Sequence, residues 1–300
     1  MLWARNKQPS LAPLSIRETT QNLFSSPLGF CVAIRGFFNY VSRMVIALLT
    51  DFGTKDYFVG AMKGAILSVN ENAKIIDITH EIPPQDTHSA NFTLRACYKN
   101  FPPKTIFVAV VDPGVGSNRR AIVVETDDYY FIAPDNGLLS FVFEEKKNFR
   151  VFELTDKKFF AEKISQTFHG RDIFAPVAAH LSTGVQPNEF GKEVKDFIHH
   201  KTARPRKVSA EKVEAEIIYI DRFGNLITNL EGKDLPEKLS LEVGTNRINK
   251  LQNFFAEAEK SEVFMILGSA GFLEIVAFQD SAANLLNAKI GQKILMTKTV

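Results

Sequence analysis

The sequence predicts an α/β domain, with a central, mainly parallel sheet flanked by helices, followed by a smaller all-β, barrel-like domain. Short continuous apolar runs at 45–49 and 106–111 are typical of strands buried on both faces. They alternate with segments of helical periodicity, an order that favours a layered α/β structure over residues 44–200. Residues 211–300 instead carry short strand-like runs separated by turns containing Gly or Asn, which favours a barrel or compact sandwich.

In the first domain, apolar residues at helical spacing follow the first strand, and Asp86 stands where a side chain can cap the next helix. Ser, Thr and Gly at 182–184 end the last helix. The expected elements are a strand at 45–49, a helix at 58–69, a strand at 74–78, a helix from about 86, a strand at 106–111, a hairpin at 121–131, a turn at 134–137 before an apolar segment at 138–143, and a helix at 173–181.

A stretch rich in basic residues, with Pro205, predicts a linker at 201–210. Beyond it the pattern changes to short strand-like runs. The strands expected in the second domain cover 214–220, 226–230, 239–243, 263–267, 272–278 and 293–297.

The composition excludes several classes of function. The chain has 300 residues and a formal charge of +2, too small to favour binding to nucleic acid or to an anionic membrane. Its two cysteines provide neither a disulfide framework nor a metal knuckle, so we expect a cytoplasmic protein. No spacing of histidines suits a metal site, and we expect neither a metal nor another cofactor.

Residues 1–43 differ in composition from the rest of the chain. They hold one acidic residue, Glu18, against five basic ones. This bias suits a transit peptide, whereas Met44, directly before the first strand, favours a start at that residue. The apolar stretch at 29–40 is broken by Arg35 and is too short to span a bilayer. We therefore expect 1–43 to be an extension outside the fold, disordered or not translated.

Two carboxylates directly follow two predicted strands. Asp51 comes after 45–49 and Asp112 after 106–111. Ligands of open parallel sheets gather outside the carboxyl ends of the strands, so both side chains are candidates for a site. Asp51 could accept hydrogen bonds from the vicinal hydroxyls of a ribose. Its alternative role is to cap the turn that follows.

Asp112 opens a glycine-rich loop that ends at Arg119. The carboxylate argues against a phosphate cradle, and a nearby guanidinium would hold it ionised. His169 lies in a turn between Phe168 and Gly170, before a helix. A structural ion pair and a structural histidine are the alternatives, and the partners of these side chains decide between them.

The second domain offers a weaker set of candidates. Asp221, Phe223 and Asn225 fall in a hairpin turn, where Asp and Asn are ordinary turn residues. Yet Phe223 could stack on a planar base, and Asn225 offers both a donor and an acceptor. A second glycine-rich turn at 268–271 leads to Phe272 and Glu274. Together these residues could form a pocket for a nucleoside.

Seven short motifs in a fixed order resemble the S-adenosyl-L-methionine (SAM) hydroxide adenosyltransferases, or SAM hydrolases, relatives of the SAM-dependent fluorinase and chlorinase. The resemblance covers residues 44–300. The motifs are Thr-Asp-Phe-Gly (50–53), Asp-Ile-Thr-His (77–80), Asp-Pro-Gly-Val-Gly-x-x-Arg-Arg (112–120), Pro-Asp-Asn-Gly (134–137), Phe-His-Gly-Arg-Asp-Ile-Phe (168–174), Asp-x-Phe-Gly-Asn (221–225) and Gly-Ser-x-x-Phe-Leu-Glu (268–274).

The resemblance implies that water cleaves SAM to adenosine and L-methionine, without a cofactor, and that Asp112, Arg119 and His169 handle the water. It implies a homotrimer whose sites combine the N-terminal domain of one subunit with the C-terminal domain of the next. The further substrate contacts that it implies are Asp51 for ribose, Asn225 and the strand from Phe272 to Ala277, with Glu274, for adenine, and Asp221, Ser269 and the more variable Asp56 for methionine.

Two other functions remain open at this point. A halogenase would need a small, dry site free of carboxylates, whereas Asp112 and His169 stand where the similar fluorinase has tyrosines. A SAM- or nucleoside-binding protein without turnover would keep Asp51, Phe223 and Asn225 but has no need of the Asp112, Arg119 and His169 set. Hydrolysis is therefore the favoured function.

Overall fold

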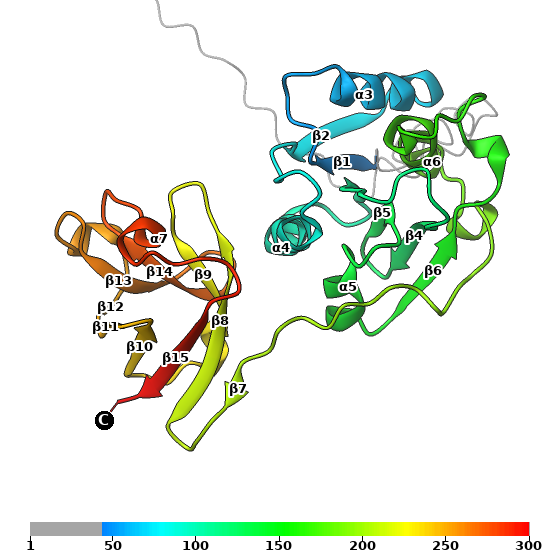
Figure 1. Ribbon diagram of the computed structural model, residues 1–300. Coiled ribbons are helices and arrows are strands. Elements are labelled where there is room, and N and C mark those ends of the chain that lie inside the picture. Colours follow the sequence, from blue (N-terminus) through cyan, green and yellow to red (C-terminus); the bar gives the residue numbers. More distant parts are fainter. Residues whose placement is uncertain (1–43, 300) are drawn as a thin grey trace, which may run out of the picture. The chain divides into compact units, whose positions relative to one another are not determined.

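The computed structural model describes residues 44–299, and the chain from Met44 onward forms one compact unit (Figure 1). The expectations for residues 1–43 lie outside the described residues. The first half of the unit contains, in order, β1 (Val45–Thr50), α3 (Phe58–Val69), β2 (Lys74–Thr79), α4 (Thr87–Cys97), β3 (Ile106–Val110), β4 (Ala121–Thr126), β5 (Tyr130–Pro134), α5 (Ser140–Glu145), β6 (Phe149–Glu153) and α6 (Ala175–Ser182).

These strands form a six-stranded sheet in the order β2-β1-β3-β5-β4-β6. The pairings β1 with β2, β1 with β3 and β3 with β5 are parallel, whereas β4 runs antiparallel to both β5 and β6. The expected α/β sheet is therefore present, and it is mixed: three of its pairings are parallel and two are antiparallel, so the expectation of a mainly parallel sheet holds only in part. The tight turn after Thr126, whose hydroxyl bonds to Tyr129, returns the chain directly and makes β4 antiparallel to β5.

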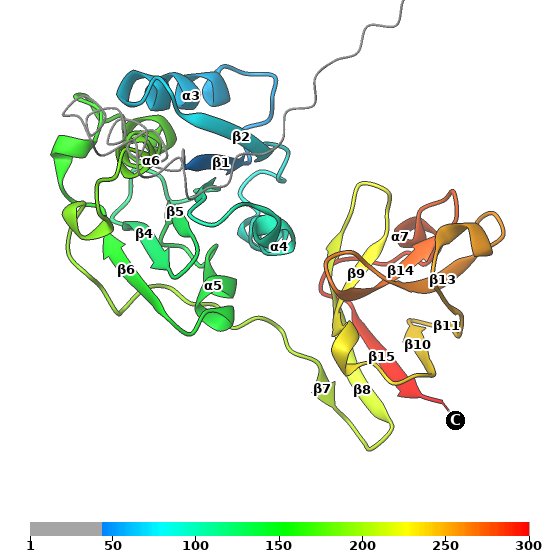
Figure 2. The ribbon, with the colours of Figure 1, turned by 180° about the vertical axis from the view of Figure 1, so that it is seen from behind.

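Alternate residues of β1 enter two separate hydrophobic clusters. Ile46 and Leu48 pack with α3 and α6, while Ala47 and Leu49 pack with α4 and α5. Figures 1 and 2 show these helix pairs on the two sides of the sheet. Successive side chains of a strand point to opposite faces, and all four of these residues are fully buried. The continuous apolar run of β1 is thus the consequence of helices covering both faces.

The second half is a single curled sheet, a half-barrel in the order β11-β10-β15-β8-β9-β14-β13-β12, with β7 paired to β8. All its pairings are antiparallel except that between β12 and β13. Its elements are β7 (Arg206–Lys207), β8 (Lys212–Ile220), β9 (Leu226–Glu231), β10 (Leu239–Val243), β11 (Asn246–Ile248), β12 (Leu251–Gln252), β13 (Val263–Leu267), β14 (Phe272–Ala277), α7 (Ala282–Leu285) and β15 (Lys293–Lys298).

Local turns complete the chain trace. Asp86 caps α4 as expected, because its carboxylate accepts the backbone N–H of Ser89 at 2.9 Å. A π-helical turn, Gly170–Phe174, precedes α6. Short 3₁₀ turns lie at Tyr98–Asn100, Lys157–Phe159, Pro187–Glu189, Gly232–Asp234 and Phe255–Glu257.

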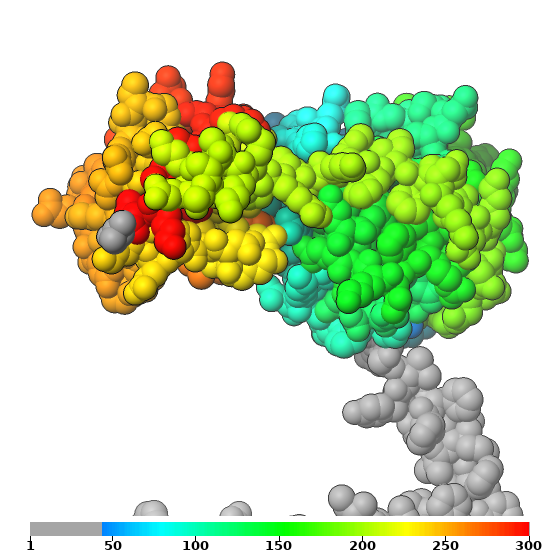
Figure 3. All heavy atoms as spheres, turned by 90° about the horizontal axis from the view of Figure 1, so that it is seen from below, coloured from blue at the N-terminus to red at the C-terminus, as the bar shows by residue number. Residues whose placement is uncertain are grey.

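The segment expected to be a linker lies largely on the surface. Residues 203–212 are exposed, and Figure 3 shows this yellow-green stretch along one face. Within residues 44–299, no helix is long and apolar enough to cross a membrane. The cytoplasmic location and the linker boundaries stay predictions.

Candidate active site

The parallel pairing of β1 with β3 brings the two strand-end carboxylates together. Thr50 lies opposite Val110 in the register, so Asp51 and Asp112 leave the sheet at the same edge. Both line a cavity of about 420 Å³, and His169 lines it as well. Three of the residues expected to form the site therefore meet in one cavity, although they lie far apart in the sequence.

Arg119 connects Asp112 to His169. Its Nε lies 2.9 and 3.0 Å from the two carboxylate oxygens of Asp112, and its Nη2 also donates to that carboxylate. The same Nη2 lies 2.8 Å from Nδ1 of His169. The side chains of Asp112 and Arg119 are only 6% and 10% exposed. A bidentate pair this buried holds both groups in fixed orientations.

The bond from Arg119 fixes the protonation of His169. A guanidinium has only donors, so Nδ1 of the imidazole is the acceptor, and the ring proton is on Nε2. Burial, with the adjacent Arg119 charge, lowers the pKa of His169, although Asp112 and Asp172 oppose that effect. The neutral ring therefore presents an N–H donor, and Nε2 cannot at the same time accept a proton.

A glycine allows the Asp112 loop to approach the segment that carries His169. Gly116 has a φ of +79°, and a Cβ placed on it would lie 2.3 Å from the backbone oxygen of Gln166. Any other residue would be strained in this conformation and would push the two segments apart. The glycine-rich loop is thus needed for close packing between segments of the site.

The π-helical turn after His169 packs tightly against an aromatic wall. A Cβ on Gly170 would lie 3.2 Å from Sδ of Met62 and 3.4 Å from the ring of Phe52. The rings of Phe52 and Phe58 lie 5.8 and 5.2 Å from that of Phe168. All three phenylalanines line the cavity. Phe52 and Phe58 were not expected at the site from the sequence, since apolar residues after a strand usually belong to the core.

Asp51 is held by a backbone donor that the sequence did not reveal. Its Oδ2 accepts the N–H of Gln85 at 2.8 Å, and Gln85 has the unusual φ of +67°. Burial raises the pKa of Asp51, and the charge of Asp112 adds to this rise, against the Gln85 bond. The two prolines before Gln85 were the only sequence sign of a special turn here.

The turn between β8 and β9 holds the next three candidates. Oδ1 of Asp221 accepts the N–H groups of Phe223 and Asn225, both at 2.9 Å, and its Oδ2 accepts the amide of Asn225 at 2.8 Å. The hydrogen bonds between Asp221 and Asn225 therefore hold the conformation of the turn. Phe223 is 76% exposed, so its ring is available for stacking.

The other candidates of this half differ in exposure. Phe272 and Ala277 are buried, and the guanidinium of Arg95 lies over the ring of Phe272, 5.0 Å from its centroid. Burial, with Asp221 nearby, raises the pKa of Glu274. Ser269 and, in the first half of the chain, Asp56 are exposed. Neither these five nor the three turn residues line the cavity that holds Asp51 and His169.

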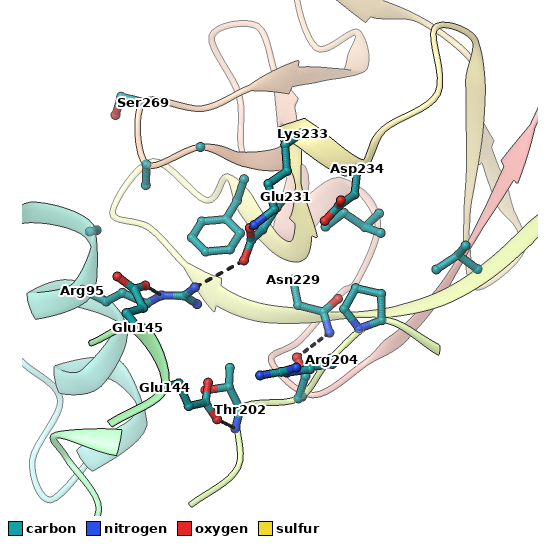
Figure 4. A pocket seen from close by; sticks show the side chains of 18 of the residues that line it. Arg95, Glu144, Glu145, Thr202, Arg204, Asn229, Glu231, Lys233, Asp234 and Ser269 are labelled. Atoms are coloured by element: carbon teal, nitrogen blue, oxygen red, sulfur yellow. Dashed lines mark hydrogen bonds and ion pairs between the residues drawn. The ribbon is translucent and has the colours of Figure 1, made fainter. Parts of the chain in front are cut away.

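A second cavity, of about 980 Å³, carries charged groups that already have partners. Arg95 lies at its wall and bonds to Glu145 at 2.6 Å and to Glu231 at 3.4 Å (Figure 4). Lys233 pairs with Glu231, and Lys99 with Glu145 at 2.8 Å. These acidic and basic side chains therefore pair with one another, and the predicted site residues Ser269 and Phe272 also line this larger cavity.

The fold and the smaller cavity together define a class of protein. An α/β sheet ends in a pocket lined by a carboxylate suited to a ribose, by an aromatic wall, and by a second carboxylate and an imidazole. The guanidinium of Arg119, outside the lining, bonds to both of the last two groups. Residues 44–299 contain no cluster of three or more His, Cys, Asp or Glu side chains able to hold a metal. This arrangement is typical of an enzyme acting on a nucleoside-like small molecule.

Comparisons with known proteins identify the family. The N-terminal and C-terminal domain models of the SAM hydroxide adenosyltransferases match residues 46–191 and 215–295. The chain therefore belongs to this family, as its motifs predicted.

Individual relatives agree with this assignment. The (R)-S-adenosyl-L-methionine hydrolase of Methanocaldococcus jannaschii is 37% identical over 259 residues, covering 81% of this chain and 92% of the relative. A fluorinase from an Actinoplanes species is 26% identical, covering 85% and 97%. The crystal structure of an uncharacterised conserved protein from Thermotoga maritima has a TM-score of 0.79 at 38% identity, covering 85% of this chain and all of that one.

Proposed function

We infer that this chain hydrolyses SAM to adenosine and L-methionine. The observation that carries the inference is that Asp112 and His169 line one cavity with Asp51, and that Arg119, outside the lining, bonds to both of them. Four relatives at 32–37% identity carry the name (R)-S-adenosyl-L-methionine hydrolase. The family and the site chemistry thus point to the same reaction.

The proposed reaction is an in-line attack of water on C5′ of SAM. The bond from C5′ to sulfur breaks, its electron pair stays on sulfur, and neutral methionine thioether leaves. Because the leaving group is already good, the reaction needs help mainly with the nucleophile, water, whose pKa is about 15.7. Placing water at attack distance contributes roughly 7–11 kcal/mol in favourable cases.

Each of the three linked residues then has a distinct part. Arg119 and the Nε2–H of His169 bind the water oxygen and stabilise negative charge that develops on it. Since His169 is held as a donor, the proton passes to the carboxylate of Asp112. A carboxylate is basic enough, because the O–H of the water becomes far more acidic as its oxygen begins to bond to C5′, and Asp112 takes the proton as that bond forms. We therefore assign the proton acceptor to Asp112 alone, and orientation to His169.

We also propose that the rest of the substrate is bound by residues from both halves of the fold. Asp51 would accept the ribose hydroxyls, and the raised pKa of its carboxyl reflects the partly dry surroundings that strengthen such bonds. Phe223 and Asn225, with the β14 strand and Glu274, would recognise adenine. Asp221, Ser269 and Asp56 would contact the methionine end.

We propose a homotrimer in which the residues around Asp51 in one subunit and the residues around Phe223 in a neighbouring subunit form each site together. Phe223 is exposed and lies outside the cavity of Asp51, so a neighbouring subunit is the natural source of the second set. Mixing and reassembling inactive His169→Ala and Phe223→Ala chains should restore activity to up to about a quarter of the sites. A mixture as inactive as its components would refute shared sites.

The main alternative is a halogenase, since fluorinases are among the relatives. A halide near the Asp112 carboxylate would be repelled, whereas water is not. A binding protein without turnover would leave the buried Asp112, Arg119 and His169 linkage without a use.

The function is tested by incubating the protein with the R and S sulfonium epimers of SAM, in EDTA and without halide, and separating the products. We expect adenosine and methionine in equal amounts, lost in Asp112→Asn. A 5′-halo nucleoside formed only after adding chloride or fluoride would favour the halogenase. Binding without any product would favour the non-catalytic protein.

A further inference from the structure

The Pro-Asp-Asn-Gly turn at 134–137 has no part in the function described so far. We propose that Asp135 and Asn136 are positioning residues that clamp both ends of the catalytic loop, residues 112–119, and so keep Asp112 and Arg119 in register with His169. This inference rests on the proposed function, because it concerns the residues that handle the water.

Asn136 holds the start of the loop. Its Nδ2 donates to the backbone oxygen of Val111 at 2.8 Å, and Val111 is bonded directly to Asp112. Its Oδ1 accepts the N–H of Leu138 at 3.2 Å, which fixes which end of the amide faces the loop. The amide therefore connects the turn to the peptide from which the catalytic carboxylate extends.

Asp135 holds the end of the loop. Its Oδ2 accepts Nε and Nη2 of Arg120 at 3.0 and 2.8 Å, and its backbone N–H donates to the oxygen of Arg120 at 2.9 Å. Arg120 directly follows Arg119. Oδ1 of Asp135 accepts the N–H of Ile198 at 2.8 Å, and the residue is only 4% exposed. The turn is thus anchored in the domain while it grips the loop.

The clamp acts only through the loop, because neither Asp135 nor Asn136 lines the catalytic cavity. Inside the loop, residues 116–118 are exposed, and its backbone bonds are short-range turns from Asp112 to Val115 and from Gly114 to Ser117. The fixed ends therefore determine where the carboxylate and guanidinium lie. A misplacement of about 1 Å at such a site can cost roughly 100-fold in rate.

The test compares two substitutions of the same kind. Asn136→Asp keeps the acceptor for Leu138 but replaces the donor to Val111 by a carboxylate. Asn91→Asp is the matched control, because Nδ2 of Asn91 also donates to a backbone oxygen, that of Leu138, at 2.8 Å. We expect Asn136→Asp to lower kcat by about 10- to 100-fold, with KM within about threefold of wild type. Asn91→Asp should leave kcat within about threefold.

A second readout separates positioning from loss of stability. His169 faces the charges of Arg119, Asp112 and Asp172. If Arg119 shifts away, the imidazole should titrate at higher pH, as followed by NMR of its ring protons in the full-length protein. Asn136→Ser, which can still donate a hydrogen bond from a shorter side chain, should recover part of the lost kcat.

Two outcomes would overturn the clamp. One is an equal loss of kcat in Asn136→Asp and Asn91→Asp, and the other is a normal kcat together with an unchanged His169 titration in Asn136→Asp. The NMR titration does not depend on turnover. If the wild-type protein forms no adenosine from SAM, the proposed function fails, whereas the displacement of Arg119 is still decided by the His169 signal.

Discussion

Replacing Arg119 by alanine should lower kcat for SAM hydrolysis by roughly 100- to 1,000-fold, the usual loss when one preorganised donor is removed from a site of developing charge. Two effects combine, because the guanidinium holds Asp112 and His169 in place and, in the proposed mechanism, also binds the water. Adenosine affinity, measured by calorimetry, should change by no more than a few-fold, since the ribose contact assigned to Asp51 is retained.

Two further variants define what the Arg119 result means. Arg119→Lys keeps the charge but loses the bidentate geometry, so its kcat should lie between those of wild type and Arg119→Ala. Arg150→Ala removes an exposed arginine that also pairs with a carboxylate, Glu125, and should leave kcat unchanged. A wild-type kcat in Arg119→Ala would remove this residue from the mechanism.

The second large effect is expected at His169, where Asn should lower kcat by about 100-fold. The pH dependence follows from the direction of its pKa shift. Burial and Arg119 favour the neutral ring, and only the neutral ring can accept the bond from Arg119. Activity is therefore present above the lowered pKa and is lost as the pH falls through it.

This prediction is checked by the profile of kcat/KM against pH. We expect a plateau that extends below the ordinary pKa of a free histidine, followed by a fall on the acid side. The His169→Asn variant should lack the part of that fall that belongs to the imidazole. An acid fall above the ordinary histidine pKa, or one unchanged in His169→Asn, would show that another group controls the rate.

The sequence could predict the parallel pair of strands and the residues at their ends. The apolar run of β1 is buried on both faces, and parallel neighbours must release Asp51 and Asp112 at one edge. The cap by Asp86 was equally predictable, because a carboxylate before a helix has free N–H groups to bind. Family motifs added the assignment of Arg119 and His169 to the same site.

Other features depend on contacts between distant segments and were not predicted. The backbone of Gln85 reaches Asp51 through a left-handed conformation that its residue type does not favour. Strand β6 includes the exposed Arg150 and pairs with the hairpin strand β4, so its local sequence alone was ambiguous. The hydrogen bond from Arg119 to Nδ1 of His169, and with it the tautomer of the ring, could be assigned only once the position of Arg119 was known.

The central claim is that water attacks C5′ of SAM, and the position of an isotope tests it most directly. The protein is incubated with SAM in water enriched in ¹⁸O, with EDTA and without halide, and both products are analysed by mass spectrometry. Attack at C5′ predicts one ¹⁸O atom in the 5′-hydroxyl of adenosine and none in methionine. Unlabelled adenosine, or no adenosine at all, would contradict the account.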